Sequence, residues 1–131
     1  MRVYLCGPIF EKTNDECRGW RSYATEIADQ YSIDVFNPMR RDYRGVQQEN
    51  QSSIVVLDKR EITLSDVLLV NWQGPSAGTS MEIIYAYDLG KPIVLVYQGK
   101  PLSPWVEYHV TQIVPDLDDA FYWINYNVAG A

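Results

Sequence analysis

Short apolar runs alternate along the chain with longer segments of mixed polarity. The runs lie at residues 2–6, 34–36, 67–70 and 93–97, and each is followed within two residues by Gly, Pro or Asn. Short apolar runs that end in turn-forming residues are typical of buried strands. The sequence therefore predicts four strands, and the run at 67–70 is apolar on both faces, as parallel strands tend to be.

The segments between these runs predict helices. Ser52 or Ser53 can cap the second of them, and Gly90 ends the third. Residues 110–114 have a second interpretation, as a fifth strand. The expected helices cover residues 15–31, 52–64, 80–89, 104–113 and 117–126.

Strands that alternate with helices predict an α/β fold with a parallel sheet of four to five strands and helices on both faces. The length of 131 residues fits one domain, residues 1–131. Ligands in such folds bind at the carboxyl ends of the strands. Residues 39–51 lack periodicity and contain Arg40, Arg41 and Arg44. We expect a long surface loop or a broken helix there, and such loops are often functional.

The composition of the chain limits the kinds of partner that it can bind and the compartment that suits it. The chain carries 11 basic and 17 acidic residues, a net charge of −6, which argues against binding to a nucleic-acid polymer because Lys and Arg supply phosphate contacts. Two cysteines are too few for a disulfide scaffold. No apolar run approaches the ~20 residues that span a bilayer. We therefore expect a soluble, cytoplasmic protein that does not associate with a membrane.

Several familiar chemistries do not fit the sequence. The loop at residues 74–80 lacks the lysine of a phosphate-binding P-loop, and no GxGxxG motif follows the first strand. His109 is the only histidine, and there is no CxxC motif, so a metal site is not expected. His109 would have to be the base in a Ser-His-Asp triad, but the sequence has no nucleophile elbow to supply the serine. We therefore expect an ordinary helix position for His109. The sequence thus predicts neither a metal nor a cofactor.

Glu82 is the first candidate for chemistry. A helix over residues 80–89 places Glu82 in the first turn, directly after the Gly-rich segment 73–79. The helix dipole at that end favours the ionised form, which a carboxylate nucleophile must adopt. Acidic residues are also common in first turns for capping reasons alone. Position by itself therefore does not identify a nucleophile.

Three segments together resemble the nucleoside 2-deoxyribosyltransferase family, which includes the related deoxynucleoside 5′-monophosphate N-glycosidases. Residues 4–10, YLCGPIF, resemble the opening strand and loop of that family. Asp58 with Ile62, followed by SDVLLV at 65–70, resembles its middle segment, and GTSMEIIYA at 78–86, ending in Gly90-Lys91-Pro92, resembles its nucleophile helix. The order and spacing of all three segments, over roughly residues 3–97, make the resemblance fairly specific.

The resemblance implies a flavodoxin-like three-layer fold and a retaining double displacement. Glu82 would attack C1′ of the sugar, Asp58 would protonate the leaving base, and Tyr4 would orient the nucleophile. This logic parallels retaining glycosidases, which use one carboxylate nucleophile and one proton donor. Alone, Asp58 is equally well an exposed helix acid, and Tyr4 a core aromatic. The loops would contact the substrate through Gly7, Pro8, Phe10, Ser76, Gly78 and Thr79.

Ser76 bears on the choice of substrate. Transferases that act on nucleosides usually have an aspartate at this position, six residues before the nucleophile, whereas the monophosphate N-glycosidases have serine. A serine hydroxyl can donate to a 5′-phosphate, which a carboxylate repels. The N-glycosidases also use a serine of a neighbouring subunit, in the segment that Ser103 resembles, and Arg44 could add positive charge. Pro8-Ile9-Phe10, by contrast, looks like the transferase side.

We therefore expect a 2-deoxyribosyltransferase that acts on a small deoxynucleoside and forms homo-oligomers, with nucleotide hydrolysis as the alternative. A non-catalytic nucleotide-binding domain is a further alternative, but a pure binder needs no matched nucleophile and acid. A structural interaction domain is a third alternative, because the tryptophans and ten tyrosines could form an interface.

Overall fold

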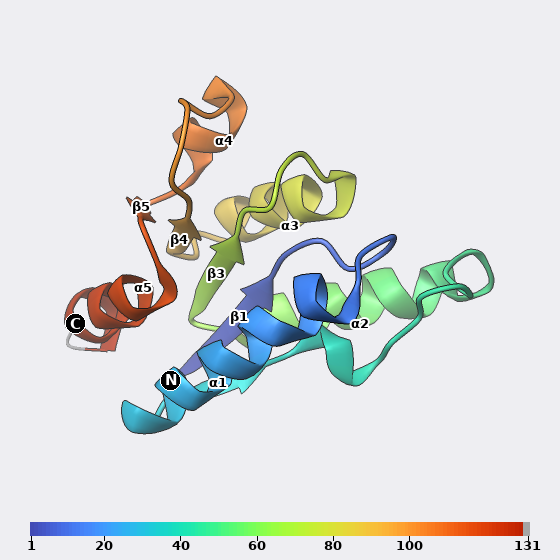
Figure 1. The fold of residues 1–131 in the computed structure, drawn as a ribbon, viewed down its shortest axis with the longest axis horizontal. Coiled ribbons are helices and arrows are strands. Elements are labelled where there is room, and N and C mark those ends of the chain that lie inside the picture. The colour runs from blue at the N-terminus through green and yellow to red at the C-terminus, as the bar shows by residue number, and fades with distance from the viewer. Residues whose placement is uncertain (130–131) are drawn as a thin grey trace.

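Five parallel strands form one sheet at the centre of the molecule (Figure 1). The computed structural model describes residues 1–129. The order β2-β1-β3-β4-β5 is that of flavodoxin-like folds, so the predicted α/β class is confirmed, with five strands. The strands are β1 (Arg2–Cys6), β2 (Asp34–Phe36), β3 (Val67–Asn71), β4 (Ile93–Val96) and β5 (Gln112–Val114).

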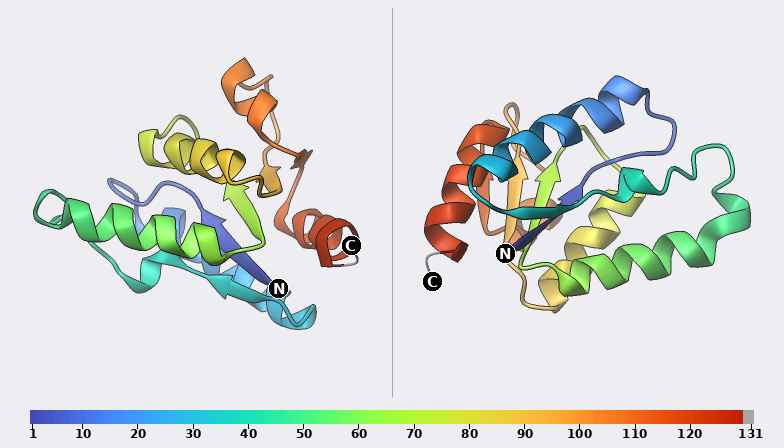
Figure 2. Two further views of the ribbon diagram at one scale, coloured as in Figure 1. Left: turned by 180° about the vertical axis from the view of Figure 1, so that it is seen from behind. Right: turned by 90° about the horizontal axis from the view of Figure 1, so that it is seen from below.

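Helices cover both faces of this sheet (Figure 2). Helices α1 and α5 lie on one face, where their apolar residues pack against Val3 and Leu5 of β1. Helices α2, α3 and α4 lie on the other, where the core contains Tyr4 and Cys6. Alternate residues of β1 thus face different layers, as the period of a strand requires. The helices are α1 (Trp20–Gln30), α2 (Gln51–Leu64), α3 (Ala77–Asp88), α4 (Pro104–His109) and α5 (Leu117–Ile124).

The prediction of a helix over residues 104–113 is wrong for residues 110–113. Helix α4 ends at His109, and residues 112–114 form β5, so the alternative interpretation of 110–114 is correct. Thr111 explains the change, because its backbone N–H donates to Ile93 O at 2.7 Å and its hydroxyl accepts from Ile93 N at 2.9 Å. These two bonds hold the chain beside β4 and prevent the helix from continuing.

Four helix boundaries also differ from the prediction. Residues 15–19 form a separate π-helical turn before α1, and a second such turn follows α5 at 125–129. Helix α2 begins at Gln51, so Ser52 and Ser53 lie inside it and do not cap it. Helix α3 begins at Ala77, because the side chain of Ser76 accepts a hydrogen bond from Thr79 N and caps the helix there.

The aperiodic segment 39–51 contains two short 3₁₀ turns, at Pro38–Arg40 and Gln48–Asn50, joined by loop. Its arginines are paired with acidic side chains, as described below. Within residues 1–129, none of the helices is both long and apolar enough to span a membrane.

Candidate active site

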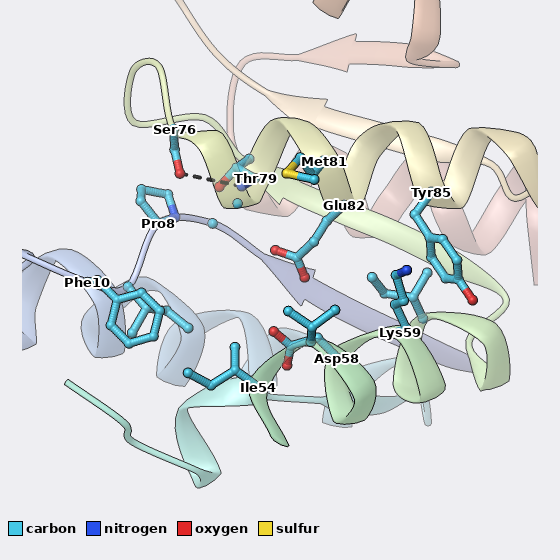
Figure 3. Close-up of a pocket in the computed structure, with 15 residues that line it drawn as sticks. Pro8, Phe10, Ile54, Asp58, Lys59, Ser76, Thr79, Met81, Glu82 and Tyr85 are labelled. Atoms are coloured by element: carbon cyan, nitrogen blue, oxygen red, sulfur yellow. Dashed lines mark hydrogen bonds between the residues drawn. The ribbon is translucent and has the colours of Figure 1, made fainter. Parts of the chain in front are cut away.

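A cavity of about 290 Å³ opens at the carboxyl end of β1. Three segments line it: the loop after β1, the middle of α2, and Ser76 with most of α3 (Figure 3). The parallel register of β1 with β3 explains this position, because β3 leads into α3 and both strands end at the same edge of the sheet. Eight residues expected from the sequence line the cavity: Gly7, Pro8, Phe10, Asp58, Ser76, Gly78, Thr79 and Glu82.

Two carboxyl groups face each other across this cavity. Figure 3 shows Glu82 extending from α3 and Asp58 from α2 into the same space. Burial raises the pKa of Asp58, and the guanidinium of Arg41, at 3.2 Å from Asp58 Oδ1, lowers it. Asp58 is therefore a half-buried acid held by Arg41, and not the exposed helix acid that it could equally have been.

Glu82 is held in an environment that disfavours its charge. Burial, followed by the charge of Asp58, raises its pKa from 4.5 to about 8, against the opposing effects of Tyr4, Arg21 and Cys6. Its Oε2 atom is buried and has no hydrogen-bond partner in the described structure. Its Oε1 atom accepts from the thiol of Cys6 at 3.8 Å.

The expectation that the helix dipole keeps Glu82 ionised is therefore wrong. Since α3 begins at Ala77, Glu82 is its sixth residue and lies in the second turn, beyond the reach of the dipole, which is confined to the first turn. Burial against the sheet then outweighs the remaining favourable interactions. The sequence could not show this, because it depends on where the helix begins.

Tyr4 and Cys6 lie on the face of β1 that meets α2 and α3. Tyr4 is only 1% exposed. Burial, then the charges of Glu82 and Asp58, raise the pKa of its phenol well above the usual range, so the hydroxyl remains a proton donor. Sequence reasoning missed the contact of the Cys6 thiol with Glu82. The alternation of residues along β1, which places Cys6 beside Tyr4, was the available signal.

The amino end of α3 forms a second, more polar part of the cavity. Ser76 and Thr79 share a hydrogen bond of 3.4 Å from Thr79 N to Ser76 Oγ. The hydroxyl of Thr79 is buried and has no partner in the described structure. Backbone N–H groups at the start of a helix favour an anion, and Gly78 adds no side chain to obstruct the approach.

Gly7 brings the loop after β1 close to α1. A Cβ atom at this position would lie 2.9 Å from Cζ2 of Trp20 and 3.3 Å from the backbone oxygen of Asn71. Only glycine fits without a shift of its neighbours. The cavity wall formed by Gly7 and Pro8 is therefore fixed by packing on α1.

Two of the expected substrate-binding residues lie outside this cavity. Arg44 donates to Asp42 and to the backbone oxygen of Lys12 at 2.9 Å, so its charge is already paired. Ser103 caps α4 by accepting from Trp105 N at 3.3 Å, and it lines a separate cavity with Trp72 and Trp105. Neither side chain reaches the Asp58–Glu82 pair within one copy of the chain.

Arg41 was considered in the sequence only as one of three loop arginines. In the structure it bridges Asp58 and Glu61, with 2.9 Å to Glu61 Oε1, and Arg40 also pairs with Glu61. Glu61 itself is buried. No pattern in the sequence places these residues together, because they come from the loop and the helix that follow β2.

His109 lies on α4 among aromatic rings, away from both carboxyl groups. Its Nδ1 is 2.6 Å from the backbone oxygen of Trp105, and its ring contacts Tyr87 edge-on. In residues 1–129, no group of three His, Cys, Asp or Glu side chains is arranged to hold a metal ion.

Fold and site together define a flavodoxin-like α/β domain with a carboxylate-lined cavity at the carboxyl ends of its strands. The family model described as nucleoside 2-deoxyribosyltransferase matches residues 3–110, most of the chain. The chain therefore belongs to the nucleoside 2-deoxyribosyltransferase family. No curated protein matches it significantly.

Solved structures show the same fold at low identity. A 2-deoxyribosyltransferase of Bacillus psychrosaccharolyticus superimposes with a TM-score of 0.77 at 21% identity, over 99% of this chain and 95% of that one. A conserved protein of Enterococcus faecalis V583 gives 0.80 at 21%, over 97% and 98%. The CMP N-glycosidase BcmB of Clostridium botulinum gives 0.65 at 17%, over 95% and 99%.

Proposed function

We propose that this protein is a nucleoside 2-deoxyribosyltransferase that forms a covalent deoxyribosyl-Glu82 intermediate. The observation that carries the proposal is the pair of facing carboxyl groups, Glu82 and Asp58, both with raised pKa values, in one cavity. Two carboxyl groups with distinct surroundings are what a retaining displacement at a sugar carbon requires. Membership of the family supplies the substrate class.

In the reactive form, Asp58 is protonated and Glu82 is ionised. The charge of Asp58 raises the pKa of Glu82, so a single proton shared by the pair is the stable arrangement. A base whose nitrogen accepts a hydrogen bond from Asp58 favours the form with the proton on Asp58. Glu82 is then left with the charge and can act as nucleophile.

The displacement proceeds in two steps. An oxygen of Glu82 forms a bond to C1′ while the bond from C1′ to the base breaks, and Asp58 gives its proton to the base. We assign the attack to Oε2, which has no hydrogen-bond partner, whereas Oε1 contacts the Cys6 thiol. A second base then displaces Glu82 and returns its proton to Asp58. Tyr4, with its phenol protonated, orients Glu82.

Hydrolysis of a deoxynucleoside 5′-monophosphate is the second candidate. It is favoured by the polar end of the cavity, where Ser76, the unpartnered hydroxyl of Thr79 and the start of α3 suit an anion. A structural neighbour is named a CMP N-glycosidase. Arg44 would have to leave Asp42 to contribute to such a phosphate site.

Assembly into a homo-oligomer belongs to the same proposal. Met81, Trp105 and Tyr108, on α3 and α4, are each more than 70% exposed, although large apolar and aromatic side chains are usually covered. A second copy on this face would cover them, and it could bring its own Ser103 towards the cavity. Cytoplasmic location remains an expectation from the sequence.

One experiment separates these functions. The protein is incubated with a deoxynucleoside plus a second free base, and separately with the matching 5′-monophosphate in water, and the products are separated by chromatography. A new nucleoside supports transfer, and free base from the monophosphate alone supports hydrolysis. If neither mixture gives a product, both enzymatic functions are refuted and the binding domain is the remaining alternative.

The intermediate is tested by intact-protein mass spectrometry after an acid quench. The wild type should gain the mass of one deoxyribosyl group, whereas Glu82→Ala should gain none and lose turnover. Glu26→Ala, at an exposed glutamate of α1, is the matched control and should behave as the wild type. Normal turnover of Glu82→Ala would refute the mechanism.

A further inference from the structure

Arg21 is a fully buried arginine outside the machinery described above. Its exposed fraction is 0%, and no carboxylate lies within ion-pair distance of it in residues 1–129. Its guanidinium instead donates to three backbone oxygens: Cys17 at 2.6 Å, Gly7 at 2.9 Å and Leu5 at 3.3 Å. It also lies over the ring of Trp20, at 4.5 Å from the centroid.

Burying a charged side chain without an opposite charge lowers the stability of the fold, so the position of Arg21 calls for an explanation. A buried charge is normally paired with an opposite charge, since desolvation strongly disfavours the ionised form. Burial indeed lowers the pKa of Arg21. Three carbonyl dipoles satisfy its N–H groups, but they do not neutralise its positive charge.

The position of Arg21 suggests what the charge serves. Leu5 and Gly7, two of its acceptors, flank Cys6, whose thiol contacts Glu82. Leu5 faces the layer of α1, whereas Cys6 faces the layer of α3. The guanidinium and the Glu82 carboxylate thus approach the carboxyl end of β1 from opposite faces of the sheet.

We propose that Arg21 is a positioning residue for the reaction, which fixes the backbone of residues 5–7 as a wall of the cavity and provides a buried positive charge for Glu82. This inference rests on the proposed role of Glu82 as nucleophile. Arg21 reaches neither substrate nor reacting atoms in this arrangement. It acts through the β1 backbone and through its field.

The charges around Glu82 support the second half of this role. Burial and the charge of Asp58 on α2 raise the pKa of Glu82 to about 8, and Tyr4 and Cys6 of β1 are neutral donors that lower it. Arg21 also lowers it, and among these groups, all within residues 1–129, it is the one that acts through a positive charge. In the free enzyme this guanidinium therefore acts with Tyr4 and Cys6 to favour the ionised form of the nucleophile.

Two variants separate the charge of Arg21 from its hydrogen bonds. Arg21→Lys keeps the charge but cannot donate to all three carbonyl groups, and Arg21→Gln loses the charge. The matched control is Arg18→Gln, at a neighbouring arginine whose side chain is 46% exposed and pairs with Asp42. Circular dichroism and thermal unfolding establish that each variant is folded.

The titration of Glu82 is followed by ¹³C NMR of its carboxyl carbon, which needs no substrate. In Arg21→Gln we expect the midpoint to rise by about one pH unit, the lower end of what a nearby charge produces. The acid limb of kcat/KM, which reports the free enzyme, should move with it, and kcat/KM at pH 7 should fall about tenfold. Arg18→Gln should match the wild type in every measurement.

In Arg21→Lys, the Glu82 titration should stay near that of the wild type, while KM rises because the cavity wall is less well fixed. A folded Arg21→Gln with an unchanged Glu82 titration would overturn the charge role, and an unchanged KM in Arg21→Lys would overturn the wall role. If Arg21→Gln does not fold, the titration of Arg21→Lys decides the charge role, since a rise there despite the retained charge would overturn it. If the wild type cleaves no deoxynucleoside or deoxynucleotide, the proposed function fails, but the titration still tests Arg21.

Discussion

Glutamine at position 82 would keep the shape of the side chain and remove its titration. In the folded protein Glu82 has a pKa of about 8, above its ordinary value of 4.5, so the folded state binds this proton more tightly than the unfolded state. The resulting stabilisation is fully present below pH 4.5 and is lost as the pH rises through 8. The wild type should therefore become less stable over this range, and Glu82→Gln should not share that loss.

The size of the effect follows from the two pKa values. The difference between 4.5 and about 8 corresponds to about 5 kcal/mol, at 1.36 kcal/mol for each pH unit. Glu82 lines an open cavity and is only partly buried, so water screens its charge, and we expect about 2 kcal/mol of this amount. For 131 residues, an unfolding entropy of about 2.1 cal/mol/K per residue converts 2 kcal/mol into a Tm change of about 7 °C.

Differential scanning calorimetry at pH 5 and pH 9 measures this directly. The Tm of Glu82→Gln relative to the wild type should be about 7 °C higher at pH 9 than it is at pH 5. Glu26→Gln makes the same chemical change at an exposed glutamate of α1 and should show no such pH dependence. A Tm difference for Glu82→Gln that is equal at both pH values would refute the account of a Glu82 whose raised pKa keeps it neutral at pH 5.

Three further changes test other parts of the site. Asp58→Asn should lower the pKa of Glu82, because after burial the charge of Asp58 is the largest cause that raises it; a ¹³C titration that does not move would contradict the coupling. Gly7→Ala should destabilise the fold by about 1–3 kcal/mol in urea unfolding, since the new Cβ would lie 2.9 Å from Trp20; an unchanged midpoint would mean that the loop adapts freely. Thr79→Val removes a buried hydroxyl that has no partner, so stability should change by less than about 1 kcal/mol. If this hydroxyl binds the substrate, the KM for the better substrate should rise in Thr79→Val, and an equal KM would remove Thr79 from the binding residues.

The sequence predicted the layers of the fold better than the details of the site. Apolar runs marked the strands, because strands buried on both faces need such runs, and the cavity lies at the carboxyl ends of the strands, as expected. The state of Glu82 was not predictable. It depends on a helix start set by Ser76 and on burial against groups from other elements.

Contacts between distant residues were also beyond the sequence. The pairing of Arg41 with Asp58 and Glu61 joins a loop to a helix, and nothing in the local pattern distinguishes Arg41 from Arg44, which pairs with Asp42 instead. Arg21 lies in a stretch of ordinary helical spacing, where a charged residue is usually solvated. Only the three-dimensional packing of α1 on β1 shows that it is buried.

The three segments that line the cavity, residues 7–10, 54–62 and 76–85, are far apart in the chain and are brought together by the parallel sheet. Parallel strands pair only across long connections, and long-range contacts form slowly during folding. Secondary structure can therefore return in a refolding chain before Glu82 and Asp58 meet. Recovery of substrate binding should follow recovery of helical circular dichroism after dilution from denaturant, which makes the site a sensitive reporter of the final step of folding.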